Sequence, residues 1–228
     1  VILAGGRGTR MSELTKKVPK PMISILGRPI LHHIMSHYSK YGFKEFIIAA
    51  GYKKKIIIDY FKKKKFSEWK IKVVDTGLNT MTGGRLKRLK KYLKKETFMM
   101  TYGDGLSDVN LKKLLKFHMK NKKISTLTSV RPPARFGAIK IIKNKVTYFK
   151  EKSKLDEGWI NGGFFVFEPS IFRYIKGDKT YLEREPLQKI SRRKQLIAFK
   201  HTGFWQCMDT TRDKELLKRE LKKRKIKL

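Results

Sequence analysis

The sequence is poor in cysteine, and it has no long hydrophobic run. Its single cysteine, Cys207, excludes an internal disulfide and favours a reducing, cytoplasmic location. No apolar run approaches the roughly 20 residues that cross a bilayer, and no segment resembles a signal peptide, so we expect no membrane partner. The chain begins at Val1, inside an apolar run, and we expect a few further residues before it.

Acidic residues are also scarce: 19 stand against 56 lysines and arginines, which gives a formal net charge of +37. Such a charge suggests an anionic partner, and a basic nucleic-acid-binding protein is a remote alternative that rests on this charge alone. The lysines are spread along the whole chain, as is typical of a general composition rather than of a binding site. We therefore expect no specific nucleic acid partner, and we expect the charge to steer anionic substrates toward the protein.

What the sequence does contain is a regular alternation of short apolar runs with amphipathic stretches. This alternation predicts an α/β fold with a Rossmann-like mixed, mostly parallel sheet flanked by helices. The expected strands are 1–4, 45–52, 69–77, 97–105, 124–130, 160–169, 197–201 and 203–209. The expected helices lie at 28–42, 55–64, 85–95 and 110–120 and at the C-terminus, with a hairpin centred on Lys143 to Lys145. No repeat or linker divides the chain, so we expect one domain over residues 1–228.

The loop LAGGRGTR follows the first expected strand. Its glycines, Gly5, Gly6 and Gly8, allow backbone N–H groups to approach a ligand, and Arg7 and Arg10 favour an anion. The loop has no Lys-Ser or Lys-Thr at the position that a P-loop requires. The dinucleotide fingerprint fails too, because its third glycine is replaced by methionine. The loop is thus predicted to hold an anion in some other way.

Three charged residues farther along complete this prediction. Pro19 and Pro21 stiffen the segment that carries Lys20, which lowers the cost of presenting its ammonium. Asp104 in TYGDG and Asp209 in FWQCMDT each follow an expected strand, at the edge where open α/β sheets bind ligands. Two carboxylates at one edge could hold Mg²⁺, and the alternative is that each caps a helix. The flanking glycines favour the metal for Asp104, while both interpretations stay open for Asp209.

The remaining candidates for chemistry are weaker. His33 and His37 are four residues apart on an expected helix, but no acid lies between them as a zinc protease motif requires. We expect all five histidines to have ordinary helix or core roles. Cys207 has no base beside it in the sequence and is expected to be a small buried residue.

Several motifs resemble those of the sugar-1-phosphate nucleotidyltransferases, and more narrowly of the glucose-1-phosphate cytidylyltransferases. They are LAGGRGTR, VPKPM, VDTG, MTGGRLKR, TYGDG, RFGAI, INGGFFVFEP and HTGFWQCMDTTRD, and they cover nearly the whole chain. The resemblance implies a fold of the nucleotide-diphospho-sugar transferase type, and transfer of a cytidylyl group from CTP to α-D-glucose 1-phosphate with Mg²⁺. A sister enzyme that uses another nucleotide or another sugar 1-phosphate is the nearest alternative, because no side chain visibly reads cytosine.

The same resemblance implies roles for individual residues. The nucleotide and its phosphates would contact Leu3, Ala4, Gly5, Gly6, Arg7, Gly8, Thr9, Arg10 and Lys20, and the nucleotide pocket would include Thr80, Arg85 and Gly103. The sugar phosphate would contact Glu151, Lys152, Asn161, Gly162 and Gly163. Asp104 and Asp209 would hold the metal, and the catalytic residues would be Arg10, Lys20, Asp104, Lys152 and Asp209. The nucleotide part would span about residues 1–130 and the sugar-phosphate part about residues 131–228.

The chain also departs from these relatives. A segment that they carry between the helix around Phe61 and the strand at Lys70 is missing here, where FKKKKFSEWK makes the connection directly. Arg7 stands where an apolar residue is common. A homo-oligomer is expected from the resemblance, but the missing segment leaves that assembly open.

Overall fold

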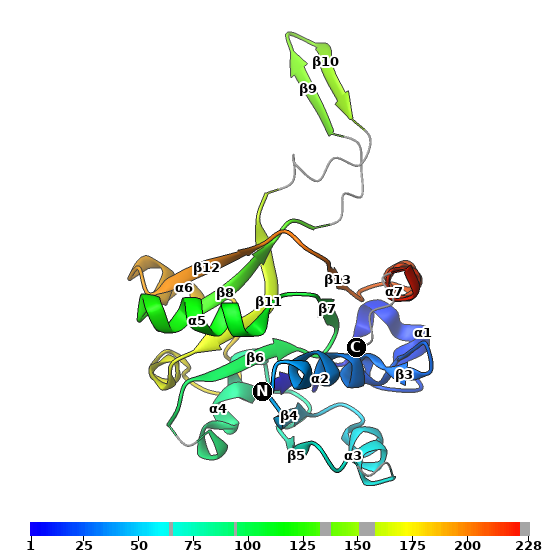
Figure 1. Cartoon of the computed structure of the whole chain (residues 1–228), viewed down its shortest axis with the longest axis vertical. Helices are drawn as coiled ribbons and strands as arrows, with labels where there is room; N and C mark the ends of the chain where they lie inside the picture. Colours follow the sequence, from blue (N-terminus) through cyan, green and yellow to red (C-terminus); the bar gives the residue numbers. More distant parts are fainter. Residues whose placement is uncertain (64–65, 94, 133–137, 151–157, 224–228) are drawn as a thin grey trace.

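The computed structural model describes residues 1–63, 66–93, 95–132, 138–150 and 158–223, and these residues form an α/β fold (Figure 1). A sheet of seven strands lies at its centre, in the order β12-β8-β11-β6-β1-β4-β5. The strands are β1 (Ile2–Leu3), β4 (Glu45–Ala50), β5 (Lys70–Asp75), β6 (Phe98–Tyr102), β8 (Ser125–Val130), β11 (Ile160–Phe167) and β12 (Leu196–His201).

The sheet is mixed and mostly parallel. β1 pairs in parallel with β4 and β6, β4 with β5, and β8 with β12. β11 pairs antiparallel with both β6 and β8, so it runs against the other described strands of this sheet. The predicted fold class is confirmed. Because parallel strands bring their carboxyl ends to one edge, the loops after β1 and β6 meet there.

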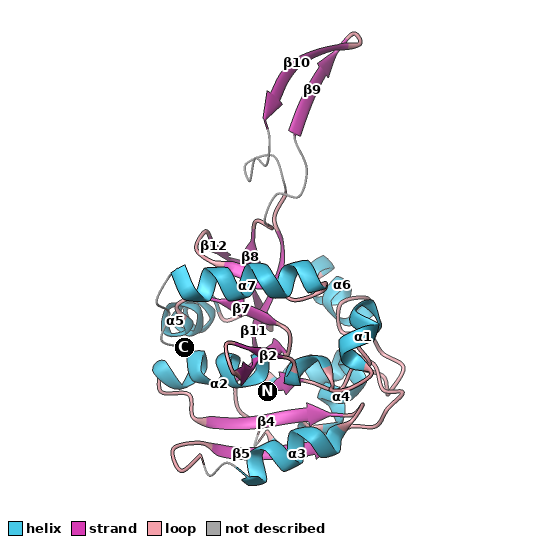
Figure 2. Ribbon diagram, turned by 90° about the vertical axis from the view of Figure 1, so that its right-hand side faces the viewer, coloured by secondary structure: helices cyan, strands magenta, loops and turns pink. Residues whose placement is uncertain are grey.

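The side chains of β11 show how both faces of the sheet are covered. Successive side chains of a strand point to opposite faces, so Phe164 and Val166 enter one core while Phe165 and Phe167 enter the other. Helices pack against both cores and enclose the sheet (Figure 2). The first core contains side chains of α2 (Ile30–Lys40), α3 (Lys54–Lys63), α5 (Leu111–Asn121) and α7 (Thr211–Lys223), and the second those of α4 (Thr82–Arg88) and α6 (Glu185–Arg192).

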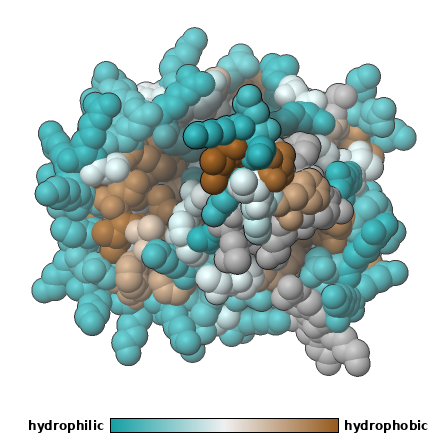
Figure 3. All heavy atoms as spheres, turned by 90° about the horizontal axis from the view of Figure 1, so that it is seen from above, coloured by the Kyte–Doolittle hydropathy of each residue, from teal (hydrophilic) through white to brown (hydrophobic). Residues whose placement is uncertain are grey.

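Three two-stranded sheets accompany the seven-stranded sheet. They are β2 (Ser24–Ile25) with β3 (Arg28–Pro29), β7 (Gly105–Ser107) with β13 (Trp205–Cys207), and β9 (Ala138–Ile142) with β10 (Lys145–Lys150). The β9–β10 pair is the predicted hairpin, and its turn residues Lys143 and Asn144 both have positive φ. The hairpin projects from the body (Figure 1). Seen from that end, hydrophilic residues lie around much of the outline of the molecule (Figure 3).

The bounds of some predicted elements differ from the observed ones. The helix expected at 85–95 begins earlier, at Thr82, and ends at Arg88, with a short 3-10 helix after it at Lys90–Tyr92. Tertiary contacts fix this start, because the backbone N–H of Gly83 donates to the carbonyl of Thr180 at 2.9 Å. The strand expected at 97–105 ends at Tyr102, and β7, which belongs to a different sheet, begins at Gly105. None of the described helices has both the length and the apolar character to cross a membrane.

Candidate active site

A cavity of about 600 Å³ opens at the sheet edge where β1 and β6 end. Its lining comes from the loop after β1, the start of α4, the turn between β6 and β7, and the first residues of β11. Arg10, Lys20, Asp104 and Asp209 all contribute to the lining. Pockets of this volume commonly bind small molecules and combine apolar walls with a few convergent polar groups. This cavity is therefore the candidate active site.

The three glycines of the loop after β1 differ in the structural constraint that each position imposes. A Cβ at Gly5 would lie 2.1 Å from Arg85 Nη1, so the guanidinium occupies the space that a side chain would need. Gly8 has a φ of +64°, a conformation that other residues rarely adopt. A Cβ at Gly6 would meet nothing within 4 Å. Gly6 is therefore the glycine whose openness leaves room for a ligand at the loop.

Arg85 holds this part of the cavity together. It is buried, and its Nη1 donates to Thr76 Oγ1 and to the carbonyl of Gly77, each at 2.7 Å. Its Nη2 donates to the carbonyl of Leu78 at 3.3 Å. Burial lowers the pKa of the guanidinium. Because the guanidinium donates to groups of Thr76, Gly77 and Leu78, Arg85 fixes the segment after β5 against the loop at Gly5.

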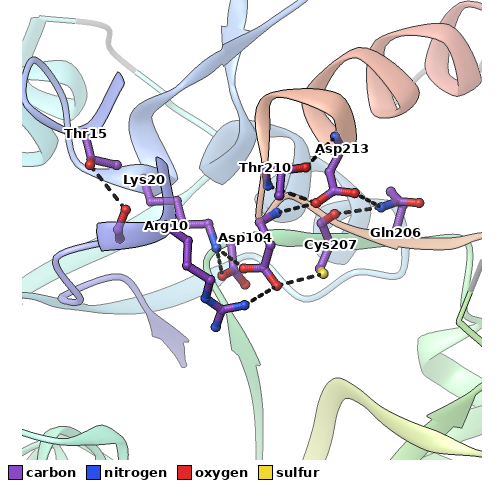
Figure 4. Close-up of polar contacts among 10 residues, drawn as sticks. Arg10, Thr15, Lys20, Asp104, Gln206, Cys207, Thr210 and Asp213 are labelled. Carbon is purple, nitrogen blue, oxygen red and sulfur yellow. Dashed lines mark hydrogen bonds and ion pairs between the residues drawn. The ribbon is translucent and has the colours of Figure 1, made fainter. Parts of the chain in front are cut away.

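The two carboxylates meet on a single ammonium group. Lys20 Nζ donates to Asp104 Oδ2 and to Asp209 Oδ1, each at 2.7 Å (Figure 4). Arg10 Nη1 donates to the other oxygen of Asp209 at 2.9 Å. The Lys20 side chain is only 12% exposed, whereas that of Arg10 is 76% exposed. Arg10 therefore reaches the site from solvent, while Lys20 forms its floor.

The electrostatics of this cluster keep Lys20 and Asp209 charged. Burial alone lowers the pKa of Lys20, but Asp104 and Asp209 outweigh it, so that the pKa lies above its ordinary value. Burial alone raises the pKa of Asp209, but Lys20 and Arg10 outweigh it and the pKa is lowered. Lys20 and the Asp209 carboxylate are therefore both ionised at neutral pH. Pro19, at φ −65°, leads into the 3-10 helix Lys20–Met22 that presents the ammonium.

Asp209 reaches Asp104 through the small β7–β13 sheet. Cys207 pairs with Gly105 in that sheet, and the next N–H, of Met208, donates to the carbonyl of Asp104 at 2.9 Å. The sequence predicted that each acid follows a strand, but it did not predict the pairing of β7 with β13 that brings the two acids together. The carboxylate of Asp209 faces Lys20 and Arg10, so the alternative role of a helix cap does not describe its position.

The structure brings most of the predicted site residues to this cavity. Its lining includes Leu3, Ala4, Gly5, Gly6, Gly8, Thr9, Arg10, Lys20, Thr80, Arg85, Gly103, Asp104, Asn161, Gly162, Gly163 and Asp209. Arg7 is not part of the lining; it is exposed and its Nη2 donates to Asn79 Oδ1 at 3.4 Å. Glu151 and Lys152 lie outside the described residues.

Several lining residues were not predicted. Tyr102 donates its hydroxyl to Glu183, whose other oxygen accepts from Thr82 at 2.6 Å. Burial and the adjacent Glu183 raise the pKa of Tyr102, so the phenol remains a neutral donor. Trp205 Nε1 donates to the carbonyl of Gly162 at 2.7 Å and fixes the glycine pair of β11. No local sequence signal marks these contacts, because each joins segments distant in the chain.

The histidines and the cysteine have supporting roles. His33 Nε2 hydrogen-bonds the carbonyl of Ile25 at 2.8 Å, and His37 Nε2 that of Val109 at 3.0 Å, so both rings are held within the core. Cys207 lines the cavity, but burial together with the nearby carboxylates raises the pKa of its thiol to about 12. Such a thiol is a poor nucleophile at neutral pH.

The donor set limits what kind of metal could bind. Among the described residues, no group of three or more His, Cys, Asp or Glu side chains is arranged to hold a metal ion. Two carboxylates, Asp104 and Asp209, do converge on one cationic group. Mg²⁺ is often bound through one or two carboxylates, with waters and substrate phosphates completing its shell. The residues present therefore fit a divalent ion that arrives with a phosphorylated substrate.

Comparisons with known proteins agree with this geometry. Residues 1–212 match the family model described as nucleotidyl transferase. The chain belongs to this family. Glucose-1-phosphate cytidylyltransferase of Salmonella typhimurium is 47% identical over 239 residues, which cover 95% of this chain and 93% of the relative. A probable glucose-1-phosphate cytidylyltransferase of Bacillus subtilis is 39% identical and covers 92% of this chain and 91% of the relative.

A solved structure shows a similar arrangement of this nucleotidyltransferase fold. HddC from Yersinia pseudotuberculosis, complexed with GMP-PN, superposes with a TM-score of 0.75 at 25% identity and covers 96% of this chain and 97% of the other. The Salmonella alignment spans 239 positions against the 228 residues here, so that relative carries residues which this nucleotidyltransferase lacks.

Proposed function

We propose that this nucleotidyltransferase transfers the cytidylyl group of CTP to α-D-glucose 1-phosphate, giving CDP-glucose and pyrophosphate. The observation that carries the proposal is the meeting of Asp104, Asp209 and Lys20 beside a glycine loop. The chain that holds this site is 47% identical to the glucose-1-phosphate cytidylyltransferase of Salmonella typhimurium. Phosphoryl chemistry needs mainly positioning and charge neutralisation, and this constellation supplies both.

In the proposed reaction, a phosphate oxygen of glucose 1-phosphate attacks the α-phosphorus of CTP. A bond to that phosphorus forms as the bond to pyrophosphate breaks, and no protein nucleophile is required. Arg10 and Lys20 bind phosphate oxygens and offset the charge that grows on the leaving group. Asp104 and Asp209 would hold Mg²⁺, whose charge, when bound, neutralises phosphate oxygens.

The substrates would occupy two parts of the cavity. The loop from Leu3 to Arg10 would bind the triphosphate, and Thr80, Arg85 and Gly103 would enclose the nucleoside. The sugar phosphate would lie toward β11, at Asn161 to Gly163, with Glu151 and Lys152 as further ligands. The nucleotide part would thus span about residues 1–130 and the sugar-phosphate part about 131–228, although one sheet includes strands of both.

A panel of nucleotides and sugar 1-phosphates tests this proposal. Pyrophosphate release is measured for each combination of CTP, UTP, dTTP, GTP or ATP with glucose, mannose or galactose 1-phosphate. We expect the highest kcat/KM for CTP with glucose 1-phosphate. A higher value for another pair would identify a sister enzyme, and release from no pair would contradict the proposed chemistry.

A further inference from the structure

A buried acid outside the cavity lining is connected to Asp209. Asp213, in the first turn of α7, is 4% exposed. Its Oδ2 accepts from the backbone N–H of Asp209 at 3.1 Å and from that of Thr210 at 2.9 Å (Figure 4). The hydroxyl of Thr210 accepts in return from the N–H of Asp213 at 3.1 Å. Thr210 and Asp213 thus form a capping box, and the same carboxylate also reaches one residue farther back, to Asp209.

Gln206 extends this network to the other side of the turn. Its side chain is buried, and Nε2 donates to the carbonyl of Cys207 at 2.8 Å and to Asp213 Oδ1 at 3.4 Å. The backbone from Cys207 to Thr210 is therefore held at three of its polar groups by two buried side chains. α7 itself is anchored in the core by Leu217 and Leu221, so it gives these contacts a fixed base.

We propose that Asp213 is a positioning residue that fixes the backbone of Asp209. It thereby orients the Asp209 carboxylate toward Asp104, so that the two carboxylates can hold the divalent cation together. The inference rests on the proposed role of the two carboxylates, but not on which nucleotide or sugar is used. A carboxylate that ligates a cation is effective only in a narrow range of orientations, and residues that orient ligands commonly affect metal affinity by about 10- to 100-fold when changed.

The alternative is that Asp213 only caps α7. A cap contributes to the stability of the protein, typically about 1 kcal/mol, and has no direct effect on the chemistry of a neighbouring site. The two roles can be separated because Thr210 belongs to the same capping box, but its hydroxyl contacts Asp213 and not Asp209. Thr210→Val removes the cap contact and keeps the shape of the side chain.

The test compares wild type, Asp213→Ala, Asp213→Asn and Thr210→Val in the full chain. Binding of Mn²⁺ in the presence of CTP, without sugar phosphate, is followed by electron paramagnetic resonance, together with kcat, the KM for glucose 1-phosphate and the unfolding midpoint. We expect Asp213→Ala to weaken Mn²⁺ binding by about 10- to 100-fold and to lower kcat with little change in KM. Thr210→Val should lower the unfolding midpoint and leave Mn²⁺ affinity within about twofold.

Equal Mn²⁺ affinity in wild type and Asp213→Ala would overturn the proposal, and so would an equal loss in Thr210→Val. If Asp213→Ala does not fold, Asp213→Asn decides: its amide keeps one acceptor and places an NH₂ against donors, so we expect weaker binding by about 10-fold. No Mn²⁺ binding by wild type would overturn both this proposal and the metal site. If only the proposed substrates are wrong, the panel of nucleotides and sugar 1-phosphates will show it through a higher kcat/KM for another pair.

Discussion

The backbone N–H of Met208 donates to the carbonyl oxygen of Asp104 at 2.9 Å, although the two residues are about a hundred positions apart in the chain. This bond continues the β7–β13 pairing by one step beyond Cys207. It places the backbones of Asp104 and Asp209 side by side, and their carboxylates then share the Lys20 ammonium. The relative position of the two acids is thus set by backbone pairing rather than by the acids themselves.

Removing either carboxylate should abolish most of the activity and preserve the fold. We expect Asp104→Asn and Asp209→Asn each to lower kcat by about 100-fold or more, because each removes a charge that the proposed cation site requires. The unfolding midpoint and kcat are measured together. Glu45→Gln, which breaks an exposed pair with Lys70, serves as a control that should retain activity. Near-normal turnover in either Asp variant would contradict the assignment.

The loop glycines should respond differently to alanine. Gly5→Ala introduces a Cβ that would lie 2.1 Å from Arg85 Nη1, and we expect a loss of about 1 to 3 kcal/mol in the free energy of unfolding. Gly6→Ala meets nothing within 4 Å, so the fold should be retained while the KM for the nucleotide rises. Denaturant unfolding and steady-state kinetics distinguish the two variants, and equal losses of stability would refute this reading of the loop.

Stability should fall on acidification, partly through His37. Burial lowers the pKa of His37 to about 4, from an ordinary value near 6.5. Between these values the unfolded chain binds a proton that the folded state does not, so the free energy of unfolding decreases as pH falls from 6.5 toward 4. The contribution is at most about 3 kcal/mol.

The variant His37→Gln removes this titration and keeps a donor for the carbonyl of Val109, with which His37 hydrogen-bonds. We expect the difference in unfolding free energy between pH 7 and pH 5 to be smaller in the variant than in wild type. Urea unfolding at the two pH values measures that difference. An unchanged difference would show that His37 does not contribute.

The net charge of +37 should act on association rates. We expect kcat/KM for CTP to fall as ionic strength rises to about 0.2 M, because salt screens long-range attraction between a cationic protein and an anionic substrate. The control is kcat at saturating substrate, which steering does not affect. A kcat/KM that is independent of salt would mean that the excess lysines have no part in substrate capture.

Much of the fold could be predicted because its strands are short apolar runs with clear boundaries. The run INGGFFVF was expected as a strand, and all of its last six residues are buried in β11. Its antiparallel direction was not predicted, since direction depends on how the chain crosses the sheet rather than on local pattern. β7 has only three residues, too few for a period to be read, and although β13 lies within the strand expected at 203–209, its pairing with β7 was not predicted.

The capping box at Thr210 and Asp213 has a signal in the sequence. The spacing of a threonine and an acid three residues later, before an amphipathic helix, is visible in the sequence and predicts a helix start. That the Asp213 carboxylate also accepts from the N–H of Asp209 does not follow from this spacing, because it depends on the backbone conformation of the turn between β13 and α7.

The sequence by itself determined the chemical types and their places at strand ends: a glycine loop with Arg10, a lysine between prolines, and Asp104 and Asp209. Local propensity and periodicity suffice for this, because they depend on near neighbours. Only the tertiary structure decided that the two acids share Lys20, and that Gly5 makes room for Arg85 rather than for a ligand. Those relationships join residues far apart in the chain, and they depend on long-range strand pairing and core packing that no local pattern encodes.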